Sequence, residues 1–209
     1  MGIARDELMR VMPAQPGVDL LEIATEALGM NSVERELIRQ PKTRPEELAS
    51  RWGVDLAQGT LGAQLTSVEA LLERAHIDYD TLLRLLNTRY ANPDRLISVS
   101  FAGTPCSLDG AVLVGEGGAA LVEKPFRELL DRLHRFLRLQ RRLACTEYEL
   151  DTLIQALGGA DFNTPLFLPQ LADTQALRDT LRLSLPELSA WWADLDTCLL
   201  YTSDAADEL

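Results

Sequence analysis

Cysteine, histidine and carboxylate side chains fall close together around Cys145, where a nucleophile, a base and an orienting acid could assemble. His134 precedes Cys145 and Glu149 follows it, so the three residue types of a thiol-based triad are present. A helix break is expected between His134 and Cys145, and no loop beside Cys145 offers amides for an oxyanion. Because a free cysteine behaves as a small hydrophobe, Cys145 is interpreted as a structural residue. Cys106 and His76 have no better partners.

A glycine-rich run from Gly115 to Ala120 matches the spacing of a dinucleotide-binding turn. In such a turn, glycines let the backbone approach a pyrophosphate at the start of a helix. The motif also requires a second strand and an acidic residue about 20 positions further on. Here that window is an arginine-rich helix, and Glu116 would place a negative charge beside the pyrophosphate. A loop before a helix is therefore preferred, and a nucleotide-binding enzyme that uses the Gly115 loop remains an alternative.

The C-terminal part of the chain carries carboxylates and two adjacent tryptophans. Asp194 and Asp196 are two positions apart, so they do not share a helical face, and with Glu187 they are interpreted as a solvated helix end. Trp191 and Trp192 could form an aromatic platform. Because large aromatic side chains dominate protein cores, one is expected in the core and the other at a helix–helix contact.

The cysteines and histidines do not predict a metal centre. Three cysteines (Cys106, Cys145 and Cys198) and two histidines (His76 and His134) are far apart, without CxxC or CxxH spacing. Neither a zinc site nor a disulfide framework is indicated. We therefore assign no catalytic, cofactor-binding or metal-ligating residue, and the sequence predicts that the chain is not an enzyme.

Composition argues against a nucleic-acid-binding or membrane-spanning chain. The 209 residues have a net charge of −12, with 46% hydrophobic and 25% charged residues, which is typical of a globular protein. Nucleic acid requires a basic footprint, so no nucleic-acid partner is expected despite the arginines at 127–142. No apolar run approaches the ~18 residues of a membrane span. The N-terminal residues MGIARDELMRVM lack the apolar region of a secretion signal.

The residues around Cys145 must be positioned by a long basic amphipathic helix, a break at Ala144–Cys145 and a second helix. Apolar residues at helical spacing predict one stripe facing a core: Phe126, Leu129, Leu130, Leu133, Phe136, Leu137 and Leu143. The arginines between them predict a solvated or inter-helix face, with exposed i,i+4 pairs Glu128–Arg132 and Asp131–Arg135. His134 is expected on a polar flank. Thr146-x-x-Glu149 predicts a capping box that opens the second helix.

The rest of the chain is punctuated by similar helix signals. Capping boxes are predicted where Ser or Thr precedes Glu by three positions, at Thr43, Thr66, Thr146 and Ser184. Helices are expected near residues 1–12, 19–30, 32–39, 43–52, 66–75, 78–89, 147–157, 165–172, 175–181 and from 184, with 53–65 irregular. Residues 96–101 and 108–114 have strand character. The predicted fold is mainly α, an irregular bundle of short capped helices with one small β-hairpin near 96–114.

These signals divide the chain into four segments. Residues 1–93 are predicted as an N-terminal helical region, 94–118 as the hairpin and glycine-rich loop, and 119–197 as a C-terminal helical region. From Leu199 the sequence LLYTSDAADEL lacks a helical stripe. It resembles translated adapter sequence from metagenomic assemblies, so residues 198–209 are predicted to be a non-native tail.

Several stretches, in the same order, resemble the A component of bacterial Tc (toxin complex) insecticidal toxins and their virulence-plasmid A-type relatives. They are Ile23–Asn31, Glu34–Ile38, Leu71–Ala75, Tyr79–Pro93, Leu133–Leu139 with Arg142 and Leu143, Thr146–Leu150, and Ser184–Thr197. Two departures stand out. Gln140 occupies a position where the family commonly has an aromatic residue, and Trp192-Ala193-Asp194 replaces a Trp-Gly-Asp sequence.

The resemblance implies a structural role. In that family the A component is a much longer homopentameric protein, whose helical shell surrounds a translocation channel. The matched stretches belong to the shell, so this chain is expected to be a non-catalytic fragment of a secreted or cell-surface-associated toxin, without direct membrane insertion. Its expected partners are the rest of the subunit and neighbouring protomers, with the B and C components bound through other parts of the parent. A free-standing helical protein-interaction module is the alternative.

Overall fold

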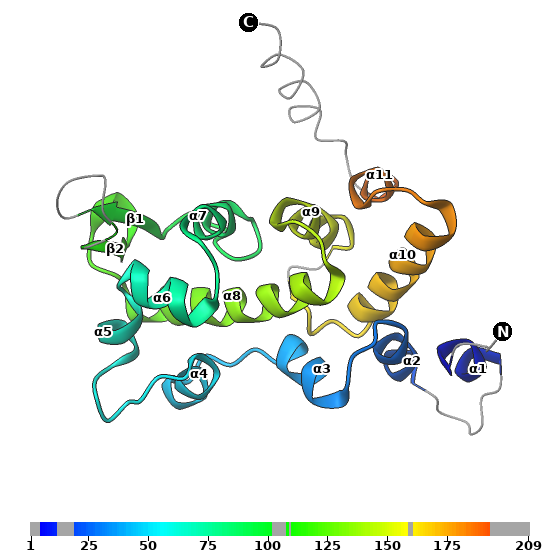
Figure 1. Ribbon diagram of the computed structural model, residues 1–209, viewed down its shortest axis with the longest axis horizontal. Coiled ribbons are helices and arrows are strands. Elements are labelled where there is room, and N and C mark those ends of the chain that lie inside the picture. Colours follow the sequence, from blue (N-terminus) through cyan, green and yellow to red (C-terminus); the bar gives the residue numbers. More distant parts are fainter. Residues whose placement is uncertain (1–4, 12–18, 102–107, 109, 159–160, 193–209) are drawn as a thin grey trace, which may run out of the picture.

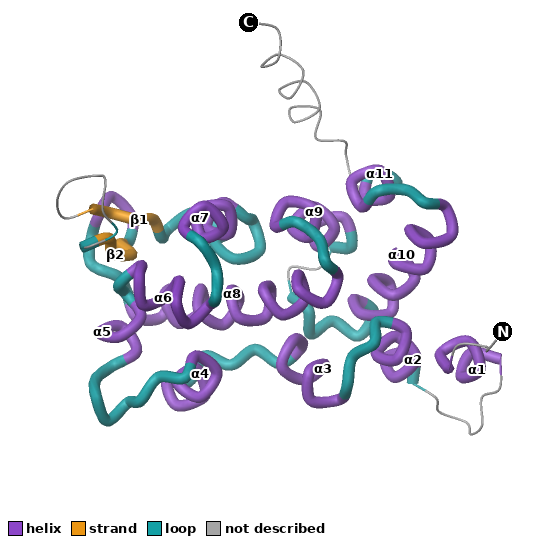
Figure 2. Tube along the Cα trace, viewed as in Figure 1, coloured by secondary structure: helices purple, strands orange, loops and turns teal. Residues whose placement is uncertain are grey.

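The computed structural model describes residues 5–11, 19–101, 108, 110–158 and 161–192. Within these ranges the chain forms eleven α-helices, a short 3₁₀ helix and one two-stranded antiparallel sheet (Figures 1 and 2). The prediction of a mainly helical fold with one small hairpin is confirmed. Cys106, Asp194, Asp196, Cys198 and the predicted tail lie outside the described residues.

The helices before the sheet are short. They are α1 (Arg5–Val11), α2 (Leu20–Ala27), α3 (Ser32–Arg39), α4 (Pro45–Trp52), α5 (Leu61–Leu65), α6 (Val68–Ala75) and α7 (Tyr79–Asn87). The sheet and the later helices are β1 (Ser98–Phe101), β2 (Ala111–Val114), η1 (Glu116–Gly118), α8 (Glu123–Leu143), α9 (Glu147–Ala156), α10 (Phe167–Leu181) and α11 (Leu185–Ser189). No helix in these ranges is both long and apolar enough to cross a lipid bilayer.

The long helix α8 runs through the middle of the molecule (Figure 1). Helices α3 and α4 pack along one side of it. On another side, Arg141 of α8 donates a hydrogen bond to the Ala75 carbonyl oxygen at the end of α6, and Phe136 stacks against Tyr90. Residues from before and after the sheet share one hydrophobic cluster. Leu133, predicted to face the core, is buried in that cluster.

Of the four predicted capping boxes, two are present and two are absent. Thr146 and Ser184 form complete capping boxes with Glu149 and Glu187. The boxes predicted at Thr43 and Thr66 are wrong, because α4 has Arg44 as its N-cap and α6 has Ser67, both without a side-chain cap bond. In the first case Pro45 fixes the start of the helix. In the second, Thr66 already ends α5 and donates its amide to the Gly62 carbonyl.

Two further predictions of local structure need correction. The segment 53–65, predicted to be irregular, contains α5, whose N-cap Thr60 accepts a bond from the Ala63 amide. The separate helices predicted at 165–172 and 175–181 are a single helix, α10. No Gly or Pro interrupts residues 173–181, so nothing in the local sequence ends the first of the predicted helices.

The hairpin lies at the N-terminal end of α8 (Figure 1). β1 and β2 pair with Val99 opposite Leu113, and the inward-facing Leu113 is buried. The outer edge of β2 is covered by the segment before α6, because the Leu113 amide donates to the Thr66 carbonyl over 2.8 Å. The sheet is therefore joined to the segment before α6 by a main-chain hydrogen bond, and the buried Leu113 anchors it in the core next to the start of α8.

Candidate functional site

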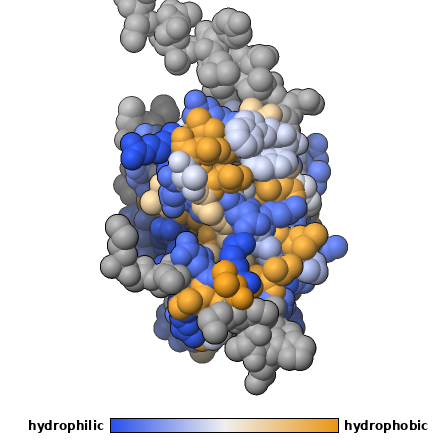
Figure 3. Space-filling view, turned by 90° about the vertical axis from the view of Figure 1, so that its right-hand side faces the viewer, coloured by the Kyte–Doolittle hydropathy of each residue, from blue (hydrophilic) through white to orange (hydrophobic). Residues whose placement is uncertain are grey.

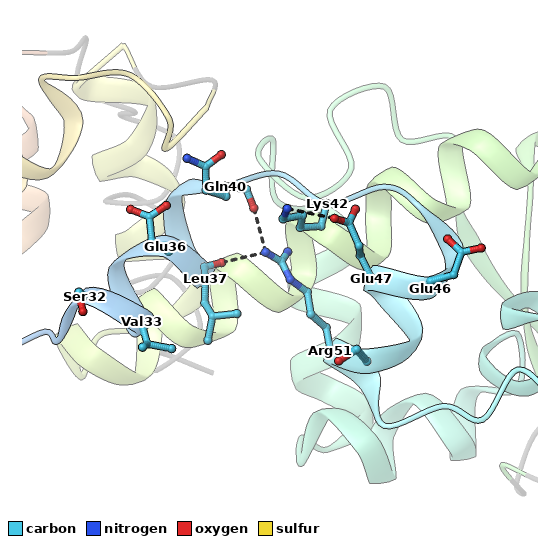
Figure 4. Close-up of a pocket in the computed structure, with 10 residues that line it drawn as sticks. Ser32, Val33, Glu36, Leu37, Gln40, Lys42, Glu46, Glu47 and Arg51 are labelled. Atoms are coloured by element: carbon cyan, nitrogen blue, oxygen red, sulfur yellow. Dashed lines mark hydrogen bonds and ion pairs between the residues drawn. The ribbon is translucent and has the colours of Figure 1, made fainter.

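The best-defined polar arrangement lies where α3 and α4 meet the middle of α8. Between α3 and α4 is a cleft of about 700 Å³, here called the α3–α4 cleft (Figure 4). It is lined by Ser32, Val33, Glu36, Leu37, Gln40, Lys42, Glu46, Glu47, Ser50 and Arg51. The two helices are joined by a connection that cannot be helical before Pro45, so the backbone carbonyls at the end of α3 remain available to side chains.

Arg51 of α4 reaches from the cleft to these carbonyls (Figure 4). Its guanidinium donates to the Gln40 carbonyl over 2.9 Å and lies 3.5 Å from the Leu37 carbonyl. On its other nitrogen it forms a 2.6 Å ion pair with Asp131 of α8. Lys42 at the cleft pairs instead with Glu47 over 3.0 Å. Arg51 therefore links α3, α4 and α8 through one side chain.

Asp131 lies beneath the cleft with both carboxylate oxygens occupied. One oxygen accepts from Arg51 and from the Lys42 amide over 2.8 Å, and the other faces Arg135 at 3.3 Å. Burial raises the pKa of the Asp131 carboxyl group, because loss of hydration outweighs the attraction of the two arginines. Asp131 does not line the cleft, and both of its oxygens already accept bonds from the protein, so it is poorly arranged as a general base for a ligand there.

Arg135 completes the cluster from the next turn of α8. Arg135 is 2% exposed, and its guanidinium donates to the carbonyls of Ile38 over 2.6 Å and Arg39 over 3.0 Å. It also contacts Asp161 over 2.5 Å, and its guanidinium carbon lies 5.2 Å from the centre of the Phe162 ring. The predicted Asp131–Arg135 pair thus exists, but the prediction that it is exposed is wrong. The cause is that α3 covers the polar face of α8.

This buried cluster of Arg51, Asp131 and Arg135 is arranged for positioning of helices rather than for chemistry. Every charge in it is opposed by another charge or by a backbone carbonyl. Such saturation offsets the cost of removing the ions from water. The same groups then fix the separation between α8 and the end of α3. Among the described residues, no group of three His, Cys, Asp or Glu side chains is arranged to hold a metal ion.

His134 lies in the core, so its predicted place on a polar flank is wrong. It is 8% exposed and packs edge-on against Trp52, with ring centres 5.9 Å apart. Its Nε2 accepts a hydrogen bond from Arg138 over 3.2 Å. Burial lowers the pKa of His134 to about 3, and the nearby charges of Arg138, Arg51 and Arg141 add to this effect. The imidazole is therefore neutral at physiological pH.

The structure does not assemble Cys145, His134 and Glu149 into a triad. Glu149 is bonded to the amide and hydroxyl of Thr146, and burial, with a smaller contribution from Glu149, raises the pKa of the Cys145 thiol to about 11. Cys145 instead shares a cleft of about 380 Å³ with His76, a neighbour that its sequence position does not indicate. A protonated thiol is a weak nucleophile.

The glycine-rich loop closes on itself. The Gly115 amide donates to the Ala119 carbonyl over 2.8 Å, and the Gly118 amide donates to the Gly115 carbonyl over 3.1 Å. These amides are therefore not free to bind a pyrophosphate, and the described strands include no parallel pair. A largely apolar cleft of about 930 Å³ lies beside the loop, between α5, β2 and the start of α8. Thr60, Thr66, Glu123 and Arg127 are its polar rim.

The tryptophans near the end of the described chain lie on the surface. Trp191 is 57% exposed and Trp192 is 46% exposed, so the prediction that one lies in the core is wrong. The buried apolar residues of α11 are instead Leu185 and Leu188. Glu187 is engaged in the Ser184 capping box, and these bonds lower the pKa of its carboxyl group.

Sequence reasoning missed two members of the polar arrangement. Arg51 and Asp161 lie far from α8 in the sequence and carry no motif, so only the tertiary structure brings them to Arg135 and Asp131. Comparison with known proteins adds no assignment. No protein-family model, curated protein or solved structure matches this chain.

Proposed function

We propose that this chain is a scaffold segment of the helical shell of a Tc-toxin A subunit, without a catalytic centre. The main support is that side chains of the resembling stretches are buried and hold helices together. Arg135 is buried and bonded to α3, while Leu133 and Phe136 lie in the core. A segment whose most distinctive residues hold helices together supports a structural role in a larger assembly.

The resembling stretch Tyr79–Pro93 supports the same proposal. After α7, Asn92 is buried and its amide donates to the carbonyls of Leu86 and Ile97 over 3.0 and 2.8 Å. The Thr88 hydroxyl donates to the Leu85 carbonyl over 2.7 Å. These bonds satisfy backbone groups that the end of a helix leaves free. The stretch therefore builds the turn between α7 and the hairpin.

An apolar surface at one end of the molecule is consistent with contact to further protein. Figure 3 faces the end that carries α1, α2, α10 and α11, and apolar surface appears there in several places. Leu20, Leu181, Trp191 and Trp192 are exposed. In the proposed shell, this end would be covered by other parts of the subunit or by neighbouring protomers. The same surface favours the alternative of a free-standing interaction module.

The DNA that flanks the coding sequence separates these two functions. We expect its reading frame to continue into further shell helices and a channel-forming region. A native frame that encodes only a short free-standing protein would contradict the shell proposal and support the interaction module.

Self-association of the chain tests the apolar end directly. We expect sedimentation velocity to show concentration-dependent association that Leu20→Glu and Leu181→Glu reduce, because a charge on each apolar contact opposes burial. Val33→Glu is the matched control, since Val33 is equally apolar and exposed but lies on α3 at the cleft. A chain that stays monomeric at every concentration would show that this end does not contact a second copy of the chain.

The nucleotide alternative has its own test. Calorimetric titration with adenine and nicotinamide nucleotides is expected to give no binding, because the loop amides at Gly115 and Gly118 are bonded within the loop. Saturable binding that Gly117→Val abolishes would restore the nucleotide-binding interpretation.

A further inference from the structure

Three arginines from different parts of the chain line one cleft between the end of α7, α8 and α9. The cleft has a volume of about 390 Å³ and is here called the arginine cleft. Its lining residues are Arg89, Tyr90, Pro93, Arg95, Arg132 and Gln155. Arg89 follows α7, Arg95 precedes β1 and Arg132 lies on α8. The fold, rather than any local motif, brings the three arginine residues to the same cleft.

None of these arginines forms an ion pair with another described residue. The i,i+4 pair predicted between Glu128 and Arg132 is absent, because Glu128 lies instead beside Lys124 at 3.9 Å. Other arginines of the same molecule are paired, including Arg84 with Glu147 and Arg142 with Glu34. In a chain of net charge −12, three cations without an ion pair at one cleft form a local positive site.

Three acidic residues close in sequence to the lining residues of the arginine cleft do not themselves line it. The Asp151 carboxylate accepts the amides of Arg89 and Tyr90, both over 2.9 Å, and does not line the cleft. Asp94 and Glu128 line an adjoining cavity that shares Pro93 and Arg132 with this cleft. The positive charge within the arginine cleft is therefore not cancelled by a carboxylate among its lining residues.

The turn that carries Arg95 has an unusual backbone. Arg95 has a φ of 52°, in the left-handed region that residues other than glycine seldom adopt. The other three such residues, His76, Ala144 and Arg182, end helices, where this conformation is common. Arg95 ends no helix, and its amide is bonded to the Asn92 carbonyl over 3.0 Å. This bonded turn places the Arg95 backbone beside the cleft.

The lining defines the class of ligand. Tyr90 is 3% exposed and its ring stacks on Phe162 and Phe136, so it offers little aromatic surface to a base or a sugar. Guanidinium groups, in contrast, match the oxygens of phosphate with paired, charge-assisted hydrogen bonds. Gln155 adds a neutral amide donor at the rim. The lining therefore suits a compact oxyanion that is recognised by charge rather than by stacking.

We propose that the arginine cleft is a binding site for a phosphate group, either free phosphate or a phosphomonoester. Arg89, Arg95 and Arg132 supply the charge, and Gln155 supplies an uncharged donor. The proposal does not depend on the toxin assignment, because it rests only on side chains that line this cleft. It also differs from nucleic-acid binding, since one cleft holds one phosphate and the surrounding chain is acidic.

Calorimetric titration of the full chain with inorganic phosphate tests the site, with chloride at equal ionic strength as the reference. O-phosphoserine, titrated in parallel, distinguishes a phosphomonoester from free phosphate, depending on which binds more tightly. We expect saturable binding that Arg132→Gln and Arg95→Gln each weaken by about tenfold or more, the loss expected for one charged donor.

Arg182→Gln is the matched control. Arg182 is also exposed, has a φ of 55° and forms no ion pair with the described residues, but it lies at the end of α10. Its substitution is expected to leave phosphate binding unchanged. Circular dichroism and the melting temperature show whether each variant is folded, and Arg89→Gln provides a third variant. Absence of binding at 20 mM phosphate (about tenfold above a weak millimolar Kd), or equal weakening by Arg182→Gln, would overturn the proposal.

Discussion

Arg135 and Arg132 lie three residues apart on α8, yet their guanidinium groups have opposite surroundings. Arg135 is enclosed by α3, Asp131, Asp161 and the ring of Phe162. Arg132 has no ion pair among the described residues and opens onto the arginine cleft. One side of the helix therefore uses an arginine to hold the fold together, and the adjacent side leaves one accessible to a ligand.

The difference shows how an identical side chain acquires a structural or a binding role. A buried guanidinium must have its donors and charge satisfied, or the fold loses several kcal/mol. Arg135 meets this requirement because the carbonyls at the end of α3 lie beside it. Arg132 is half-buried and has no equivalent set of acceptors among the described residues.

The largest loss of stability is expected from Leu133→Asp, which places a carboxylate in the hydrophobic cluster. Leu133 is 1% exposed and belongs to the buried hydrophobic cluster. The free energy of unfolding should fall by more than about 4 kcal/mol, measured by urea denaturation. Leu133→Met is the control and should cost less than about 1.5 kcal/mol. A native melting temperature for Leu133→Asp would show that α8 is rotated away from the orientation described here.

Arg135→Met should be the next most damaging change. It leaves Asp131 with Arg51 as its only cationic partner and removes the donors to the Ile38 and Arg39 carbonyls. We expect a loss of about 3–5 kcal/mol in chemical denaturation. Arg135→Lys should be nearly as unstable as Arg135→Met, because an ammonium group cannot reproduce the forked bonds of a guanidinium. Full recovery by lysine would mean that charge alone, and not geometry, stabilises this contact.

Acidification should destabilise the protein through His134. Its pKa is lowered from 6.5 to about 3 in the folded state, so the unfolded state binds more protons between these pH values. Stability should therefore be fully present above pH 6.5 and fall as the pH decreases toward 3. The expected loss between pH 7 and pH 5 is about 2 kcal/mol. His134→Gln should flatten this part of the pH profile, and an unchanged profile would assign the effect to other groups.

The smallest effect on stability is expected from Arg132→Gln. Because Arg132 has no ion pair with a described residue, the free energy of unfolding of the protein should change by less than about 0.5 kcal/mol. The same substitution should weaken phosphate binding in calorimetry. A large loss of stability would show that Arg132 is structural like Arg135, and the contrast between the two positions would disappear.

The Ser/Thr-x-x-Glu motifs predicted a capping box correctly only where no neighbouring residue imposed a different helix start. Thr146 and Ser184 cap helices as predicted because their amides and hydroxyls bond only to the glutamate three residues ahead. At Thr43, Pro45 imposes a different first residue on the helix, and at Thr66 the preceding helix already uses the amide. A motif of four residues contains no information about such neighbours, so half of the capping boxes were predicted incorrectly.

The candidate site was less predictable than the helices. Arg51 and Asp161 are separated from Arg135 by long stretches of chain, and no spacing rule connects them. The arginine cleft has the same character, since Arg89, Arg95 and Arg132 come from three segments. For the charged residues of α8, the sequence proposed only i,i+4 pairs within the helix. Of the two proposed on α8, Asp131–Arg135 forms and Glu128–Arg132 does not.

By itself, the sequence determined the helical fold class, the hairpin and the apolar stripe of α8, because periodicity and turn residues act over a few positions. Only the tertiary structure decided what happens to the opposite face of that helix. Leu133 and Arg135 lie about 200° apart around α8, yet both are buried, since α3 and α4 cover the polar side. Whether an arginine there is solvated, saturated or open to a ligand depends on acceptors contributed by distant backbone, which helical periodicity does not encode.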